Sequence, residues 1–272
     1  MKKIVLLITI SILFVSCKDN DVQDTITPKT QLVTKISSEK GVWDFTYDSD
    51  LRLIEAQTTY MINPLKISFF YNEKGQIDSS ATVYVNSSGG ETANTFEYDD
   101  QGQLIRYFNS YFDRGVLIEK DTTEISLTDE GLYRIHPPGA DWGSKSFRYE
   151  GDNMKNIICF DCVTSGFDHT YMDKASFLPK EFRRYWNIYT GKRPIGFLSY
   201  HEMGSEDLLK DFFDIGPNLL PVSLQNEYET DPDSGQIISV KSILTSRAGY
   251  YMPTGMKAGD VWATYEFTYS EF

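Results

Sequence analysis

The residue whose chemistry can be read most directly from the sequence is Cys17. It follows residues 4–15, an uncharged and mostly apolar stretch that Lys2 and Lys3 precede. A short positive segment, an apolar core of this length and a small residue before the cut are typical of a secretory signal peptide. The stretch is also shorter than the roughly 20 residues of a membrane-spanning helix. We therefore expect cleavage after Ser16, with Cys17 as the first residue of the mature chain.

Together with Cys17, the residues Phe14-Val15-Ser16 resemble the lipobox of bacterial lipoproteins. The resemblance implies that the Cys17 thiol carries a lipid, whose acyl chains contribute about 0.8 kcal/mol of membrane affinity per buried CH₂. An ordinary signal peptide followed by a chance cysteine is the alternative. The segment Lys18-Asp19-Asn20-Asp21 resembles the export signal of lipoproteins that face the exterior from the outer membrane. A solvated tether is the plainer interpretation of that segment.

Two further cysteines, Cys159 and Cys162, lie in the order Cys-Phe-Asp-Cys. Outside the cytoplasm such a pair often forms a disulfide, for which the chain must turn between the two residues. A redox Cys-x-x-Cys is the alternative. That motif works at the N-terminus of a helix, whereas strand-like residues flank it here.

The remaining residue types with reactive side chains form no recognisable motif in the sequence. His136, His169 and His201 lie far apart, and Asp231–Gly235 departs from calcium-loop spacing and predicts a turn. We expect no metal and no cofactor. The sequence leaves open whether the chain is an enzyme, and the preferred interpretation is that it is not. A glycan hydrolase, which would need two carboxylates, is the alternative.

Aromatic residues are abundant, with 18 Tyr, 17 Phe and 4 Trp. Exposed Tyr and Trp rings can stack on sugars. The candidate ligand-contact residues are Tyr185, Trp186, Tyr189, Tyr250 and Tyr251. The alternative is that these rings form cross-strand pairs and fill the core of a sheet.

The net charge of −13 restricts the partners of the chain. Nucleic-acid binding needs a basic surface, so this class is excluded. An acidic chain is not drawn to anionic lipid either, so the acyl group has to provide the attachment to the membrane. The expected partners are the membrane, through the lipid, and a carbohydrate or an envelope protein.

A degenerate block recurs along the chain: an aromatic residue, Tyr, Asp or Asn, a polar turn, Gly, and then Leu or Ile. The clearest copies are Phe69–Ile77 and Phe96–Leu104, while Phe45–Leu53 lacks the glycine and Tyr228–Ile237 is stretched. Asp and Asn can bond their own backbone, and Gly supplies a positive φ, so each block predicts a β-hairpin. In residues 77–85, the apolar side chains share one parity, which predicts a half-buried strand.

The expected fold is therefore all-β, an antiparallel meander of many hairpins that forms a curved sheet or a wide soluble barrel. One short helix is expected near 205–215, where Ser205 can cap the N-terminus and Gly216-Pro217 can end the helix. The expected organisation is a signal peptide over 1–16, a lipidated flexible tether over 17–34 and a single β-rich domain over 35–272.

The block resembles the YD repeat of Rhs-type proteins. The order of lipobox, hairpin blocks, the segment before Gly216-Pro217 and the late block at Tyr228–Ile237 is similar to a family of outer-membrane lipoproteins of unknown function that are porin-like in fold. This resemblance implies no catalytic residues. We expect an outer-membrane lipoprotein that faces the cell exterior and acts as a binding or interaction module, with a structural envelope scaffold as a further alternative.

Overall fold

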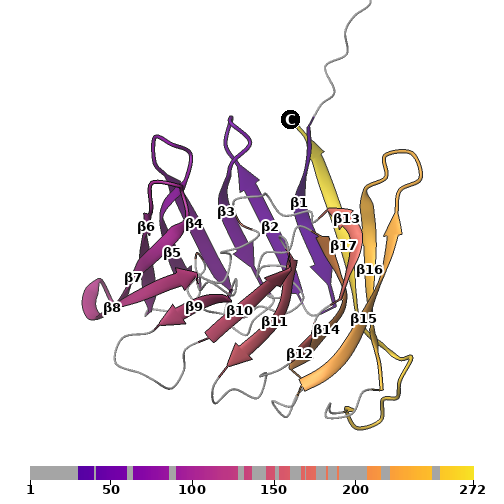
Figure 1. Ribbon diagram of the computed structural model, residues 1–272. Helices are drawn as coiled ribbons and strands as arrows, with labels where there is room; N and C mark the ends of the chain where they lie inside the picture. Colours follow the sequence, from indigo (N-terminus) through magenta and orange to yellow (C-terminus); the bar gives the residue numbers. More distant parts are fainter. Residues whose placement is uncertain are drawn as a thin grey trace, which may run out of the picture.

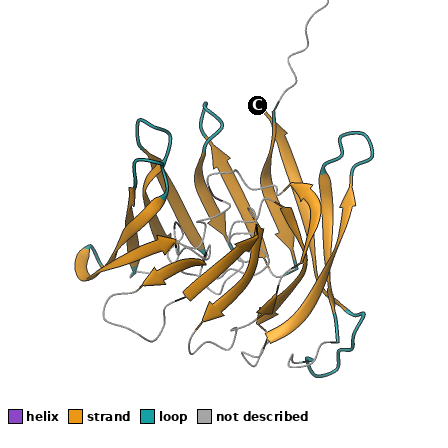
Figure 2. Cartoon of the chain, viewed as in Figure 1, coloured by secondary structure: helices purple, strands orange, loops and turns teal. Residues whose placement is uncertain are grey.

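The computed structural model of the chain consists of one large antiparallel sheet of 17 strands that curves around a common interior (Figure 1). It describes residues 30–39, 41–59, 64–85, 90–127, 132–136, 145–150, 153–159, 167–168, 170–175, 182, 189, 207–215, 221–246 and 252–272. Strands account for almost all of the described elements (Figure 2). The all-β meander expected from the sequence is thus confirmed.

The bounds of the strands are β1 (Gln31–Ser38), β2 (Gly41–Tyr47), β3 (Leu53–Thr58), β4 (Leu65–Tyr71), β5 (Ile77–Tyr84), β6 (Glu91–Tyr98), β7 (Leu104–Asp113), β8 (Val116–Leu127), β9 (Leu132–His136), β10 (Lys145–Glu150), β11 (Asn153–Cys159), β12 (Phe167–Asp168), β13 (Thr170–Ala175), β14 (Asp207–Ile215), β15 (Pro221–Thr230), β16 (Ile237–Leu244) and β17 (Val261–Glu271). The first strand begins inside the range expected for the tether.

Neighbours in the chain are neighbours in the sheet. Each strand from β1 to β11 pairs with the strand that follows it, as does each from β13 to β16, and β1 also pairs with β17. Among the described residues, no pairing joins β12 to β13, because β12 pairs with β11 whereas β13 pairs with β14. In this part of the chain the sheet is curved but is not closed by a continuous ladder.

The recurring block forms the same turn at three places, which start at Asp48, Asn72 and Asp99. In each, the side-chain Oδ1 accepts hydrogen bonds of 2.8–3.0 Å from the backbone N–H groups two and four residues later. The fourth residue has a positive φ, which is 76° at Gly75 and 79° at Gly102. In all three hairpins a register shift lies at the block tyrosine, directly before the turn, so each turn is joined to a β-bulge.

The tyrosine of the block links one hairpin to the hairpin before it. The Tyr71 hydroxyl donates to the Leu53 carbonyl at 2.8 Å, and Tyr98 donates to Ile77 at 2.7 Å. Tyr269 donates to Ile237 at 2.9 Å in the same way. In each pair the acceptor is the apolar residue that follows a block turn. The tyrosine of the block thus holds each hairpin in a fixed position relative to the hairpin before it.

We predict that Gly75→Ala lowers the free energy of unfolding by about 1 kcal/mol, because an L-residue in the left-handed region is strained. An added Cβ at Gly75 would meet no atom within 4 Å, so the whole loss should come from the backbone. Gly75→Asn is the matched control and should lose less, since Asn tolerates this conformation. Denaturant unfolding measures both changes; a Gly75→Ala domain as stable as the parent would contradict the assignment of the turn.

The two faces of the described strands differ in polarity. The buried side chains are mostly apolar and lie on the concave face, among them Leu53, Ile67 and Phe96. The outer face carries ion pairs instead: Lys66 with Glu55, and Arg106 with Glu97 at 3.1 Å and with Glu124 at 3.2 Å. A strand that faces lipid has an apolar outer side, which is the reverse of this arrangement. The outer face of these strands therefore suits contact with water.

The prediction of a short helix near 205–215 is wrong, because Asp207–Ile215 forms strand β14. This strand pairs with β13 on one side and with β15 on the other, through pairs such as Phe212 with Leu224. The spacing of the apolar residues in this segment is compatible with the period of a helix and with that of a strand. The backbone hydrogen bonds that two neighbouring strands offer outweigh a local cap and stop signal.

The alternation expected for residues 77–85 is present, but its buried side is the other one. Ser80 and Thr82 are buried, with exposed fractions of 1% and 3%, whereas Ala81 and Val83 are partly exposed. A register shift between Phe70 and Tyr71 leaves one residue of β5 unpaired and changes the parity after Ile77. A one-residue slip moves every later side chain to the opposite face.

Candidate functional site

A cluster of aromatic rings fills the concave side of β4–β6. Phe182 and Tyr189, both with helical backbone conformation, contact each other with ring centroids 5.9 Å apart. Phe182 packs edge-on against Phe69 at 4.8 Å, and Tyr189 packs against Phe96 at 4.8 Å. Edge-to-face packing of this kind adds to the stabilisation that burial alone gives.

Polar side chains fix Tyr189 to the sheet. Ser80 donates to the Tyr189 carbonyl and accepts from Asn94 Nδ2 at 3.3 Å, and Asn94 Oδ1 accepts from Asn109 Nδ2 at 2.9 Å. The Tyr189 and Tyr98 hydroxyls lie 3.1 Å apart. Because the one proton of Tyr98 is given to a backbone carbonyl, Tyr189 must be the donor between the two.

This position corrects one expectation from the sequence. Tyr189 was expected on an exposed, ligand-stacking surface, but only 3% of its surface is exposed and its ring packs in the interior. The other candidates for ligand contact, Tyr185, Trp186, Tyr250 and Tyr251, lie outside the described residues, as do Cys17 and Cys162. Cys159 is the last residue of β11, and the structure describes only its backbone, so the expected disulfide stays a prediction.

Burial of Tyr98 predicts a pH effect on stability. Desolvation raises the pKa of Tyr98 to about 12, against about 10 for an unperturbed tyrosine. The folded chain then holds a proton that the unfolded chain has lost, so the free energy of unfolding should fall as the pH rises from about 10 toward 12. Tyrosinate absorbance, recorded against pH for the parent and for Tyr98→Phe, checks the raised pKa. The replacement should remove one tyrosine from those that ionise near pH 12. Equal absorbance changes in this pH range for the two proteins would contradict the prediction.

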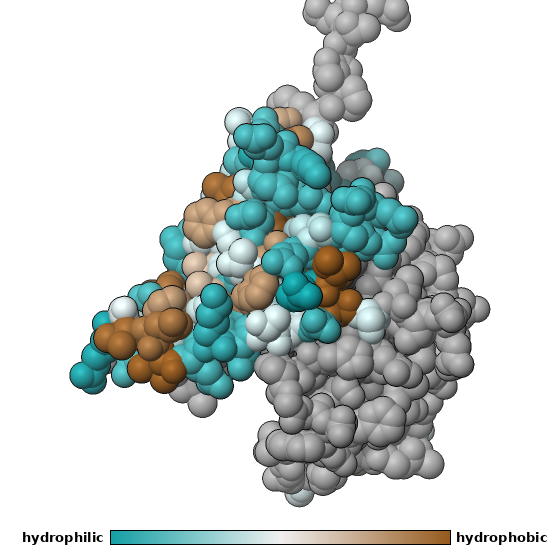
Figure 3. Space-filling view, turned by 60° about the vertical axis from the view of Figure 1, so that its left-hand side comes forward, coloured by the Kyte–Doolittle hydropathy of each residue, from teal (hydrophilic) through white to brown (hydrophobic). Residues whose placement is uncertain are grey.

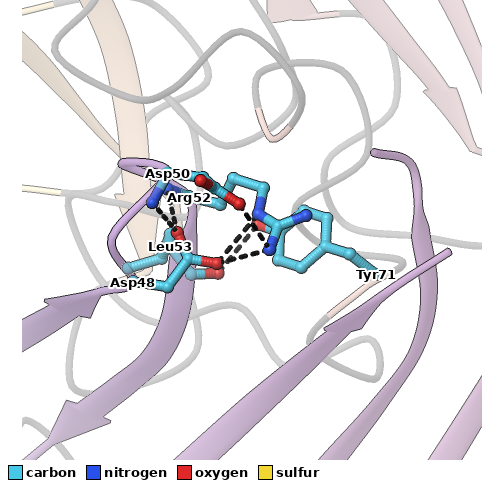
Figure 4. Close-up of polar contacts among 5 residues, drawn as sticks. All are labelled: Asp48, Asp50, Arg52, Leu53 and Tyr71. Atoms are coloured by element: carbon cyan, nitrogen blue, oxygen red, sulfur yellow. Dashed lines mark hydrogen bonds and ion pairs between the residues drawn. The ribbon is translucent and has the colours of Figure 1, made fainter. Parts of the chain in front are cut away.

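The charged residues of the first block turn serve the turn itself (Figure 4). Asp48 Oδ2 accepts from Arg52 Nε at 2.8 Å, and the guanidinium also contacts Asp50 at 3.3 Å. The guanidinium lies 4.9 Å from the centre of the Tyr71 ring. In this copy of the block Leu51 occupies the glycine position with a φ of 62°, and the ion pairs hold the turn that the sequence otherwise disfavours.

No group of three or more His, Cys, Asp or Glu side chains able to hold a metal ion is found within the described ranges. In that same part of the chain, no helix is long and apolar enough to cross a membrane.

The hairpin formed by β7 and β8 ends in a cluster of exposed aliphatic side chains. Val116, Leu117 and Ile118 are consecutive and are 61%, 50% and 60% exposed. They follow the two-residue turn Arg114-Gly115, whose positive φ angles of 49° and 77° are typical of a tight hairpin. Hydrophobic atoms gather on this projecting hairpin, at the lower left of Figure 3. We refer to Asp113–Lys120 as the hairpin tip.

The hairpin tip stands out among the exposed residues. Every residue in it is exposed, and it extends past the neighbouring strands. On its outer side β8 pairs with β9 only from Glu124 to Leu127, so the described strands cover β8 on the β7 side alone from Val116 to Thr123. Exposed apolar residues that adjoin one another mark interaction surfaces more often than scattered ones do.

The chain enters the domain at the end opposite the hairpin tip. Gln31 pairs with Glu271 at the end of the sheet that carries the block turns, and its side chain accepts a hydrogen bond from Gln236 of the late block. Since successive strands are antiparallel, the β2–β3, β4–β5 and β6–β7 turns lie at this end and the β7–β8 turn lies at the other (Figure 1).

The sequence matches no protein-family model and no curated protein. Among solved structures, the chain is similar to a porin-like protein from Bacteroides uniformis, with 12% identity, 90% of this chain and 98% of that chain covered, and a TM-score of 0.40. It is also similar to a porin-like protein from Bacteroides vulgatus, with 12% identity, coverages of 89% and 99%, and a TM-score of 0.38. At these TM-scores the likeness decides neither function nor location.

Proposed function

We propose that this chain is a lipid-anchored interaction module of the bacterial outer membrane that faces the exterior and makes contact through its hairpin tip. The observation that carries the proposal is the run of three exposed aliphatic residues, Val116, Leu117 and Ile118. Keeping them in water has a cost of about 25 cal/mol for each Å² of apolar surface, which a contact would remove.

The anchor in this proposal rests on the sequence. The apolar segment before Cys17 and the Lys-Asp-Asn-Asp that follows it support a lipidated cysteine and export to the surface. The polar outer face of the sheet supports a domain that lies outside the hydrocarbon core and is attached through the tether. The acidic residues of the described block turns bind backbone N–H groups, which suits a structural role rather than a catalytic one.

In-cell photo-cross-linking tests the proposal. A photoreactive amino acid replaces Leu117 at the hairpin tip, and Lys241, an exposed residue of β16, is the matched control position. We expect adducts with a protein or with lipid from position 117 and few from position 241. Equal yields at the two positions, or no adduct at 117, would overturn the hairpin tip as the contact surface.

A further inference from the structure

We infer that the hairpin tip docks on the surface of the lipid bilayer that holds the anchor. The inference rests on the proposed function above and names its partner. A three-residue apolar tip is too small to hold a protein on a membrane alone. The acyl chains on Cys17 would hold the chain on the membrane, and the hairpin tip would fix how the domain lies on it.

The shape of the hairpin tip favours a bilayer over a protein partner. Val116, Leu117 and Ile118 are exposed residues of the hairpin tip. The hairpin projects from the domain as a convex point (Figure 3). A convex apolar point needs a matching pocket on a protein, whereas the interfacial region of a bilayer yields around it. The two-residue turn keeps the tip narrow, because Asp113 already pairs with Val116.

The charge of the hairpin tip differs from that of the whole chain. Asp113 and Glu119 contribute two negative charges, and Arg114 and Lys120 contribute two positive charges, so the sum is 2 − 2 = 0. The whole sequence carries −13. The hairpin tip is thus a neutral part of an acidic chain and is not repelled by anionic headgroups. The long side chains of Arg114 and Lys120 can reach the headgroups while the aliphatic residues enter below them.

The depth of docking follows from the charges that flank the aliphatic run. Arg114 lies just before it, and Glu119 and Lys120 follow it directly. Because charged side chains are costly in hydrocarbon, the contact is limited to the interfacial region, about 5–10 Å deep.

The tether is long enough for this arrangement. From Cys17 to Gln31 there are 31 − 17 = 14 residue steps, which span at most roughly 46–50 Å when extended. Strand β7, which runs from the block-turn end to the hairpin tip, has 10 residues and a length of roughly 33 Å. The domain can therefore lie along the membrane with the anchor near one end and the hairpin tip near the other.

Tryptophan quenching by brominated lipid tests the inference on the full lipidated protein in phosphatidylcholine vesicles whose acyl chains carry bromine. Leu117→Trp reports on the hairpin tip, and Lys74→Trp, in the β4–β5 turn, reports on the opposite end. The signal of the unsubstituted lipoprotein is subtracted because it has 4 tryptophans of its own. We expect quenching at position 117 to exceed that at position 74 by about twofold or more.

A second variant pair and flotation of the same vesicles separate the outcomes. Val116→Asp together with Ile118→Asp, in the Leu117→Trp background, should remove the excess quenching. A protein that floats with the vesicles but is quenched equally at both positions, or more at 74, would overturn the docking and leave the anchor intact. A protein that does not float would overturn both the anchor and the docking.

Discussion

Replacing Cys17 with alanine is expected to abolish incorporation of labelled fatty acid and to release the chain from the membrane fraction. The thiol of Cys17 is the proposed point of lipid attachment, and acyl chains account for nearly all of the membrane affinity of an acidic domain. The effect should be close to complete.

Ser16→Ala is the matched control for the cysteine replacement. It keeps a small residue before the cut and should leave labelling unchanged. Metabolic labelling with a fatty-acid analogue, followed by membrane fractionation, measures both variants. Labelling that persists in the Cys17→Ala chain would disprove the anchor, and labelling that disappears in both variants would point to loss of export instead.

The second large effect is expected from Phe182→Ala, with a loss of about 3–5 kcal/mol in the free energy of unfolding. Phe182 is fully buried, and its ring contacts Phe69 and Tyr189. A domain of ordinary stability has only about 5–15 kcal/mol in total, so this one change should remove a large share.

Phe70 provides the matched control for Phe182. It is the neighbour of Phe69 in β4 but is 53% exposed, so Phe70→Ala should change the stability by no more than about 0.5 kcal/mol. Denaturant unfolding of the two variants side by side measures the difference. If both variants lose the same stability, Phe182 does not belong to the core.

The hairpins could be predicted because their signals are local. Asp48, Asn72 and Asp99 each bond their own backbone within four residues, and the glycine position sits at a fixed offset from them. All the residues that form such a turn lie next to one another in the sequence. The tyrosine bond to the preceding hairpin spans only 18 residues at Tyr71 and 21 at Tyr98, but its acceptor is a backbone carbonyl, which no sequence pattern marks.

The failures have longer-range causes. Ser80 faces the interior because it bonds the Tyr189 carbonyl, 109 residues away, and a bulge turns the strand to allow it. Asp207–Ile215 is a strand because β13 and β15 pair with it on both sides. Neither partner can be read from the segment itself. Tyr189 was expected outside for the same reason, since an aromatic residue suits a core and a binding surface equally.

The hairpin tip was missed although the sequence carries a signal for it. Asp113-Arg114-Gly115 predicts a turn, and three consecutive aliphatic residues follow it. In a half-buried strand, apolar residues alternate with polar ones, so such a run directly after a turn breaks the pattern. An uninterrupted run of aliphatic residues directly after a turn therefore distinguishes an exposed apolar tip from the beginning of an ordinary half-buried strand.

Protease shaving of intact cells tests the central claim, a lipid-anchored domain on the cell surface, most directly. A periplasmic protein serves as the internal control. We predict that the domain is digested while the periplasmic control survives. A domain that resists digestion until the outer membrane is broken would contradict exposure on the cell surface and place the domain on the periplasmic side.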